Sequence, residues 1–359
     1  MNYIKSILLL FSAIPLLAMQ YQSRADDFTP YMPIKGKFTV DGKGAAKYSI
    51  PIETVKAKLQ PNLSLSYNSQ SGGSYVGNGW SLNGSPAIRM CSLNKRQDNK
   101  WSNIMINMGV DNYAVNRFCL SGSRLSVIAG DYGADESQYQ SELMGKYIIT
   151  AKGKCGDGPC SFEVKNSDGT IDVYGGDANS TVQFENKDIL IWGMKTHTDK
   201  FGNQVAYTYE PSDKTNVLYP AEIDYFFNAD KSDSRKVLFT YTAKSETNRQ
   251  QKRIGLGGYS FKPDKVLSKI TTQDLKGVAV FNYDMTTVYD KFSDTYALTK
   301  LTKTSGDGKQ SYLDHTFGYK DYQPGVPDFV ANNTVTMPSD GEDWNGVKVV
   351  IMDKYGDGI

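Results

Sequence analysis

The chain has 359 residues, 39% of them hydrophobic, and its formal net charge is only +1. A charge this close to balance gives no global electrostatic basis for binding nucleic acid or an anionic membrane. Histidine is the commonest metal ligand, so the presence of only two histidines excludes a His-rich metal centre. The 24 tyrosines and 33 glycines instead favour β-structure with many turns.

The first 25 residues have the pattern of a secretory signal peptide. Lys5 provides a positive charge, the apolar run 7–19 follows it, and Ser23 and Ala25 place small residues before a cleavage site. The run is too short to cross the ~30 Å of bilayer hydrocarbon as a helix. We therefore expect cleavage after Ala25, a secreted protein, and no membrane span in the mature chain.

Apolar residues alternate in three short segments after residue 36. Period-2 alternation bounded by Gly, Pro and Asn predicts strands over 38–40, 48–52 and 63–67. The dipeptide Asp41-Gly42 between the first two segments favours a hairpin turn. Helical signals are scarce, and a short helix over 137–144 is the only candidate.

The four cysteines are Cys91, Cys119, Cys155 and Cys160. An even number in an exported protein favours two disulfides, with Cys155 bonded to Cys160 across a Gly/Pro loop and Cys91 bonded to Cys119. Free thiols are the alternative. A zinc site is disfavoured because the chain has no Cys-x-x-Cys pair.

After residue 190 one layout recurs four times: an apolar strand, a polar turn, and a strand that ends in aromatic-x-Tyr. The four segments are 192–209, 221–241, 267–283 and 298–319, and they close on Tyr209, Tyr241, Tyr283 and Tyr319. A single hairpin is weak and buries its face against its neighbours. The repeat therefore predicts an all-β fold, an extended antiparallel sheet that grows hairpin by hairpin, with few short helices.

Several segments, in order along the chain, resemble the N-terminal domain of the SpvB family, which also opens the B component of the insecticidal Tc toxin complexes. They are 36–52, 63–72, 76–84, 117–122 with Arg124-Leu125, and 161–169. Residues 192–209 then resemble the RHS/YD-like hairpins of that family. The resemblance covers residues 33–359 and implies that the hairpin sheet is a segment of a β-shell.

The resemblance also implies a division of the chain. An SpvB-like β region is expected over 26–190, RHS/YD-like hairpins over 191–340, and the start of a truncated FG-GAP/VCBS-like repeat over 341–359. In such repeats an Asp-x-Asn-x-Asp-Gly loop binds Ca²⁺ through oxygen ligands. Asp353 and Asp357 fit this loop and are weak candidates for a Ca²⁺ site. Because Tyr355 replaces a ligand, a plain turn is the alternative, and no other cofactor is expected.

No catalytic motif stands out. The Glu-x-Glu motif of the ADP-ribosyltransferase domain that ends some SpvB-family proteins is absent, and so are a Walker loop and Gly-x-Ser-x-Gly. His197 and His315 each lie in a strand-like context and are expected to be structural, hydrogen-bonded residues. The sequence therefore predicts a protein that is not an enzyme.

Three hypotheses follow. The first is a structural and assembly module of a secreted Tc-type toxin, part of a shell that encloses or carries a toxin payload. Its partners would be other toxin-complex subunits or a downstream shell or propeller partner, because exposed edges of the last hairpin need covering. The second is a stand-alone secreted module that binds a surface glycan or a protein. The third is a hydrolase that uses two acidic residues.

Overall fold

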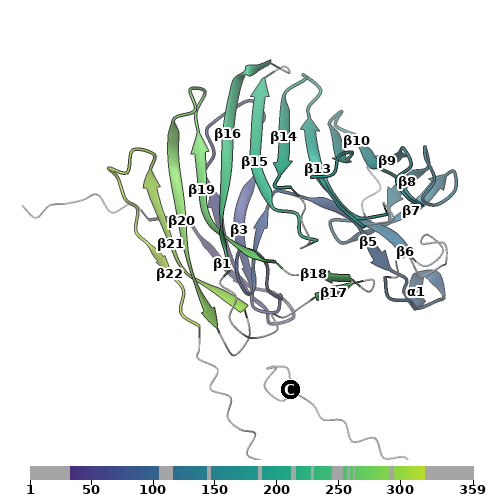
Figure 1. The fold of residues 1–359 in the computed structure, drawn as a ribbon, viewed down its shortest axis with the longest axis horizontal. Coiled ribbons are helices and arrows are strands. Elements are labelled where there is room, and N and C mark those ends of the chain that lie inside the picture. The colour runs from purple at the N-terminus through teal and green to yellow at the C-terminus, as the bar shows by residue number, and fades with distance from the viewer. Residues whose placement is uncertain are drawn as a thin grey trace, which may run out of the picture. The chain divides into compact units, whose positions relative to one another are not determined.

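The computed structural model confirms the all-β fold class (Figure 1). The described residues up to Phe317 form one compact unit, which holds three antiparallel sheets of four, sixteen and two strands. The structure describes residues 33–104, 116–143, 147–184, 188–211, 216–227, 230–244, 254–256, 259–261, 263–290 and 295–319.

The four-stranded sheet is built from the first strands of the chain, in sequential order. Its strands are β1 (Lys37–Val40), β2 (Ala46–Ile52), β3 (Leu63–Asn68) and β4 (Trp80–Asn83). The three strands expected from alternation are confirmed. Ile50 and Leu65 face each other across β2 and β3 and are fully buried, because period 2 places every second side chain on the core side.

The turn between β1 and β2 is organised by Asp41. Its side chain accepts hydrogen bonds from the backbone N–H groups of Lys43 (2.9 Å) and Ala45 (3.0 Å). The hairpin is present as expected, but the glycine it requires is Gly44, whose φ of 81° is left-handed, and not Gly42. The same Asp-centred turn recurs at Asp199 and at Asp274, where it joins β13 (Ile189–Thr198) to β14 (Gln204–Tyr209) and β19 (Lys265–Gln273) to β20 (Ala279–Asp290).

Replacing Gly44 by alanine is expected to lower the free energy of unfolding by about 1–2 kcal/mol, because L-residues are strained in the left-handed region. A Cβ at this position meets nothing within 4 Å, so the loss reports backbone conformation alone. Gly42→Ala is the matched control, since Gly42 has the same open space without a positive φ. Equal losses in the two variants, measured by urea denaturation, would contradict this account.

The next strands close into a ring. Each strand from β5 to β11 pairs with its successor, and β13 pairs with both β11 and β5. The short β12 also pairs with β13. The strands are β5 (Ala87–Ser92), β6 (Asn116–Leu120), β7 (Ser123–Ala129), β8 (Gln138–Ser141), β9 (Tyr147–Lys152), β10 (Ser161–Asn166), β11 (Ile171–Gly175), β12 (Thr181–Gln183) and β13 (Ile189–Thr198).

Aromatic rings form the core of this ring of strands. The centroid of Phe118 lies 5.0 Å from that of Phe162 and 5.4 Å from that of Trp192, in edge-to-face arrangements. Tyr139 lies edge-on to Phe118 at 5.5 Å. The indole N–H of Trp192 donates to the Pro159 carbonyl (3.0 Å), so its one polar atom is paired. These geometries are favourable for aromatic pairs.

The prediction of a short helix over 137–144 is wrong. Residues 138–141 form β8, and Ser137, Tyr139 and Ser141 are buried at alternating positions. The hydroxyls of Ser137 and Tyr139 bond each other (2.7 Å), which lets these polar residues face the core. The helix that the structure contains is α1 (Lys95–Asp98), capped by the side chain of Asn94.

From β13 onward the sheet stays open and advances hairpin by hairpin, as Figure 1 shows from β13 across to β22. All four predicted hairpins are present: β13–β14, β15–β16, β19–β20 and β21–β22. The further strands are β14 (Gln204–Tyr209), β15 (Pro220–Phe227), β16 (Asp230–Ala243), β17 (Ile254–Leu256), β18 (Tyr259–Phe261), β19 (Lys265–Gln273), β20 (Ala279–Asp290), β21 (Thr295–Ser305) and β22 (His315–Thr316).

β13 runs across residue 190, where the sequence predicts a boundary between two regions. Its first half pairs with β5 and β12, and its second half pairs with β11 and β14. One sheet is therefore continuous through this point, and the division of the chain at 190 stays a prediction.

Three of the four tyrosines expected to close the hairpins, Tyr209, Tyr241 and Tyr283, act as buried or partly buried hydrogen-bonding groups, whereas Tyr319 lies beyond β22 and is 38% exposed. Tyr209 donates to the Met194 carbonyl (2.8 Å) of the preceding strand, and Tyr241 donates to the Pro220 carbonyl (2.7 Å). Burial raises the pKa of Tyr209 to about 12, so its hydroxyl stays protonated and can donate at neutral pH. Tyr283 instead accepts a bond from the backbone N–H of Glu53 (2.9 Å).

The loops that join β2 to β3 and β3 to β4 in the four-stranded sheet contact the open sheet. Tyr225 donates to the Val55 carbonyl (3.0 Å), and the N–H of Leu267 donates to the Tyr75 carbonyl (2.7 Å). One hydrophobic core runs through both sheets. The loop 53–62 is therefore held over the ends of β14, β15 and β16, where it completes a pocket.

Candidate functional site

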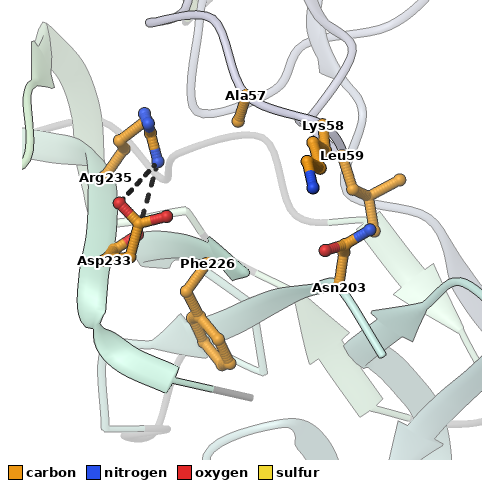
Figure 2. A pocket seen from close by; sticks show the side chains of 7 residues that line it. All are labelled: Ala57, Lys58, Leu59, Asn203, Phe226, Asp233 and Arg235. Atoms are coloured by element: carbon orange, nitrogen blue, oxygen red, sulfur yellow. Dashed lines mark hydrogen bonds and ion pairs between the residues drawn. The ribbon is translucent and has the colours of Figure 1, made fainter. Parts of the chain in front are cut away.

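A pocket of about 220 Å³ lies where the loop after β2 crosses the open sheet (Figure 2). Three residues of the loop and four residues at the strand ends form its walls. They are Ala57, Lys58 and Leu59 from the loop, and Asn203, Phe226, Asp233 and Arg235 from the sheet. Two positively charged side chains and one carboxylate therefore face one small space.

Asn203 brings an unpaired acceptor to this pocket. Its side chain is held by the turn before β14, where its amide nitrogen donates to Asp199 Oδ2 (2.6 Å). The amide orientation follows, because exchanging N and O would set two acceptors against each other. Asn203 is only 3% exposed, and its Oδ1 has no hydrogen-bond partner. Figure 2 shows this oxygen turned towards the space under Lys58.

Arg235 brings an unpaired donor. Its Nη1 lies 3.3 Å from the Asp233 carbonyl oxygen and 3.4 Å from Asp233 Oδ1, but its buried Nε has no partner. A buried polar atom without a partner costs about 1–3 kcal/mol, and native structures contain few of them. An unmatched donor and an unmatched acceptor around one pocket are the chemical signature of this site.

The two histidines lie outside the pocket and are engaged in other contacts. His197 on β13 faces Asp172 on β11, with 2.5 Å between Nδ1 and Oδ1. His315 lies beside Tyr48, with its Nδ1 3.4 Å from the tyrosine hydroxyl. Both arrangements are the hydrogen-bonded, structural ones that the sequence led us to expect.

The His197–Asp172 pair predicts a pH dependence of stability. The hydrogen bond to Asp172 raises the pKa of His197 above its ordinary value. The stabilisation is therefore complete below the unfolded pKa of about 6.5 and is lost as pH rises through the higher folded pKa. Relative to His197→Asn, the wild-type protein should be more stable near pH 5.5 than near pH 8.5, by about 1 kcal/mol. Urea denaturation of both proteins at the two pH values measures this, and parallel profiles would contradict it.

The four cysteines form the two expected disulfides. Cys91 is bonded to Cys119 across β5 and β6, and Cys155 is bonded to Cys160 in the turn between β9 and β10. The alternative of free thiols is therefore wrong, and no cysteine is left to bind a metal.

The weak Ca²⁺ candidates Asp353 and Asp357 lie outside the described residues. Among the residues that the structure describes, no group of three or more His, Cys, Asp and Glu side chains could hold a metal ion. No helix of that same part of the chain is long and apolar enough to span a membrane.

Lys303 is a buried charge that the sequence analysis missed. It lies on β21, is 1% exposed, and its Nζ is 3.0 Å from Glu53 Oε2. The same Nζ lies 4.1 Å from the ring centroid of Phe281, 4.0 Å from that of Tyr312 and 5.6 Å from that of Tyr283. The ion pair with Glu53 thus holds the loop after β2 against the open sheet, and the surrounding aromatic rings stabilise the buried ammonium.

Two sheet edges differ in how they are covered. The outer edge of β21 is partly covered, because Tyr296 accepts a bond from the N–H of Asn78 and residues 311–317 run along the rest of it. β1 is the terminal strand of its sheet, and all four of its residues are exposed, including Phe38 (64%) and Val40 (60%). A fully exposed terminal strand with apolar side chains invites pairing with another chain.

Comparison with protein families identifies a family over more than half of the chain. The family model for SpvB, described as Salmonella virulence plasmid 65kDa B protein, matches residues 40–291. No curated protein matches the chain.

Comparison with solved structures gives matches of similar fold. The crystal structure of TcdB2-TccC3 aligns with a TM-score of 0.63 and 15% identity, covering 82% of this chain and 17% of that one. A Tc holotoxin pore structure from Photorhabdus luminescens aligns with a TM-score of 0.62 and 14% identity, covering 81% and 16%. The N-terminal domain of effector protein SpvB from Salmonella typhimurium strain LT2 aligns with a TM-score of 0.53 and 13% identity, covering 71% and 98%. At these identities the likeness shows the fold, and the chain spans about a sixth of the length of the Tc toxin chains.

Proposed function

Because the chain belongs to the SpvB family, we propose that it is a non-enzymatic structural module of a secreted Tc-type toxin, forming part of a β-shell that encloses or carries a toxin payload. The family match over 40–291 carries the proposal. It is supported by the fold, since the open hairpin sheet and the small sheet over it align with toxin-complex chains over about four fifths of this chain.

A non-enzymatic role is consistent with the side chains of the described residues. His197 has a hydrogen-bond partner on β11 and His315 has one on β2, and the described residues contain no metal-ligand cluster. A screen for glycan hydrolysis and NAD turnover tests this part of the proposal. Turnover that is lost when one acidic residue is replaced would point to a hydrolase instead.

Export is supported by the two disulfides, which form and persist in oxidising compartments. The proposed signal peptide over 1–25 lies outside the described residues. N-terminal sequencing of the exported protein tests it, and a mature chain that starts at Asp26 is the expected result.

The open edge of β1 is the feature of the small sheet that best fits a partner subunit. We expect the full-length mature chain to self-associate at high concentration when its partners are absent, because β1 is an edge strand among the described residues and exposes Phe38 and Val40. Replacing both side chains by lysine should shift the protein to a monomer in size-exclusion chromatography with light scattering.

Val288→Lys is the matched control for this experiment. Val288 is 54% exposed, but it lies on β20, an inner strand of its sheet that pairs with β21 at Val288 and with β19 over residues 279–284. The control should associate like the wild-type protein. A wild-type chain that stays a stable, soluble monomer would count against the assembly proposal.

A stand-alone binding module is the second candidate, and the polar pocket in Figure 2 is the observation that favours it. The two candidates separate cleanly, since the assembly role needs the edge of β1 and the binding role needs the pocket.

A further inference from the structure

The pocket between the loop 57–59 and the strand ends is lined by two residues that each have a buried polar atom without a hydrogen-bond partner. Asn203 Oδ1 needs a hydrogen-bond donor, and Arg235 Nε–H needs an acceptor. Both atoms are buried, and their own side chains are fixed by bonds to Asp199 and Asp233. Neither side chain can turn to satisfy the other without giving up the bond it already makes.

Charge restricts what can meet both demands. A carboxylate would accept from Arg235 and would be attracted by the two cations, but it has no proton for Asn203 Oδ1. An ammonium would donate to Asn203, but it would lie beside two cations, Arg235 and Lys58, and has no acceptor for Nε. An apolar group would leave both atoms unpaired. A neutral group that donates and accepts at once is what remains, and a hydroxyl is such a group.

Size restricts the ligand further. The pocket holds about 220 Å³, which is room for a ligand larger than one bridging water. Its rim is open to a solvent-borne group, because Lys58 is exposed. Four polar side chains are spread around the walls, and adjacent ring hydroxyls present several donor–acceptor groups in fixed positions.

We propose that this pocket binds a neutral sugar unit, whose hydroxyls donate to Asn203 Oδ1 and accept from Arg235 Nε. The site is independent of the shell proposal, because it lies at the ends of β14, β15 and β16 and uses no residue of the β1 edge. A toxin module that assembles through β1 could carry this site, and so could a stand-alone binding protein.

Saturation-transfer NMR on the full mature chain with a panel of neutral hexoses tests the proposal. We expect at least one hexose to bind, and Arg235→Lys to weaken it by about tenfold or more, because lysine cannot reproduce the Nε–H. Ala57→Phe is the second variant. It fills the pocket from the half-buried loop while leaving Asn203 and Arg235 unchanged, and should abolish binding even if Arg235→Lys folds poorly.

Lys56→Ala is the control, because Lys56 is an exposed neighbour on the same loop that does not line the pocket. It should bind like the wild-type protein. The proposal is overturned if no hexose binds, if Ala57→Phe binds as well as the wild type, or if only a carboxamide probe such as acetamide binds, which would indicate a peptide ligand.

Discussion

Replacing Trp192 by alanine is expected to lower the free energy of unfolding by about 3–5 kcal/mol, the usual cost of truncating a large buried aromatic residue. Trp192 is fully buried and lies 5.1 Å, centroid to centroid, from Phe162. The substitution removes these ring contacts and also leaves the Pro159 carbonyl without its indole donor. Because β13 pairs with both β5 and β11, the cavity would lie beside the strand that closes the ring.

The chain offers a matched control in Trp101, which is 74% exposed. Trp101→Ala should change stability by no more than about 0.5 kcal/mol, as is usual for surface substitutions. Urea denaturation followed by circular dichroism suits both variants, because the signal does not depend on the tryptophan that is removed. A loss of less than about 1 kcal/mol for Trp192→Ala would mean that Trp192 does not support the closure of the ring.

The hairpin sheet could be predicted from the sequence because its signals are local. The recurring layout of an apolar strand, a polar turn and an aromatic-x-Tyr segment acts within a few tens of residues, and it predicted the four hairpins. The closed ring could not be predicted, since it depends on pairings between distant strands, such as β11 with β13. The segment 137–144 was misread because Ser137 and Ser141 look solvent-facing, whereas each is buried with a hydroxyl partner, Tyr139 and Ser123 respectively.

The candidate site was harder to predict than the fold. Lys303 continues the inward alternation of Leu301, but a lysine at an inward position is ordinarily taken as a break in the pattern. Only its distant partner Glu53 and the cage of rings explain its burial. The pocket likewise joins the loop 57–59 to residues more than 140 positions later, and no local motif marks either side.

Replacing Glu53 by glutamine is expected to lower the free energy of unfolding by about 2–3 kcal/mol, because it leaves the ammonium of Lys303 buried without a counter-charge. The aromatic cage offsets part of this cost. Lys303→Met in the Glu53→Gln background should then recover most of the loss, since methionine fills a similar volume and removes the uncompensated charge.

This recovery separates an ion pair, in which Lys303 is buried and Glu53 is half-exposed, from simple packing. If Lys303 acted only as an apolar stem, Glu53→Gln would be nearly neutral and Lys303→Met would have the same effect in either background. The exposed pair of Lys309 and Asp307, 3.8 Å apart, is the control, and Asp307→Asn should leave the free energy of unfolding nearly unchanged. A double variant that is no more stable than Glu53→Gln alone would contradict the view that Lys303 and Glu53 together hold the loop after β2, and with it the pocket wall at 57–59, against the open sheet.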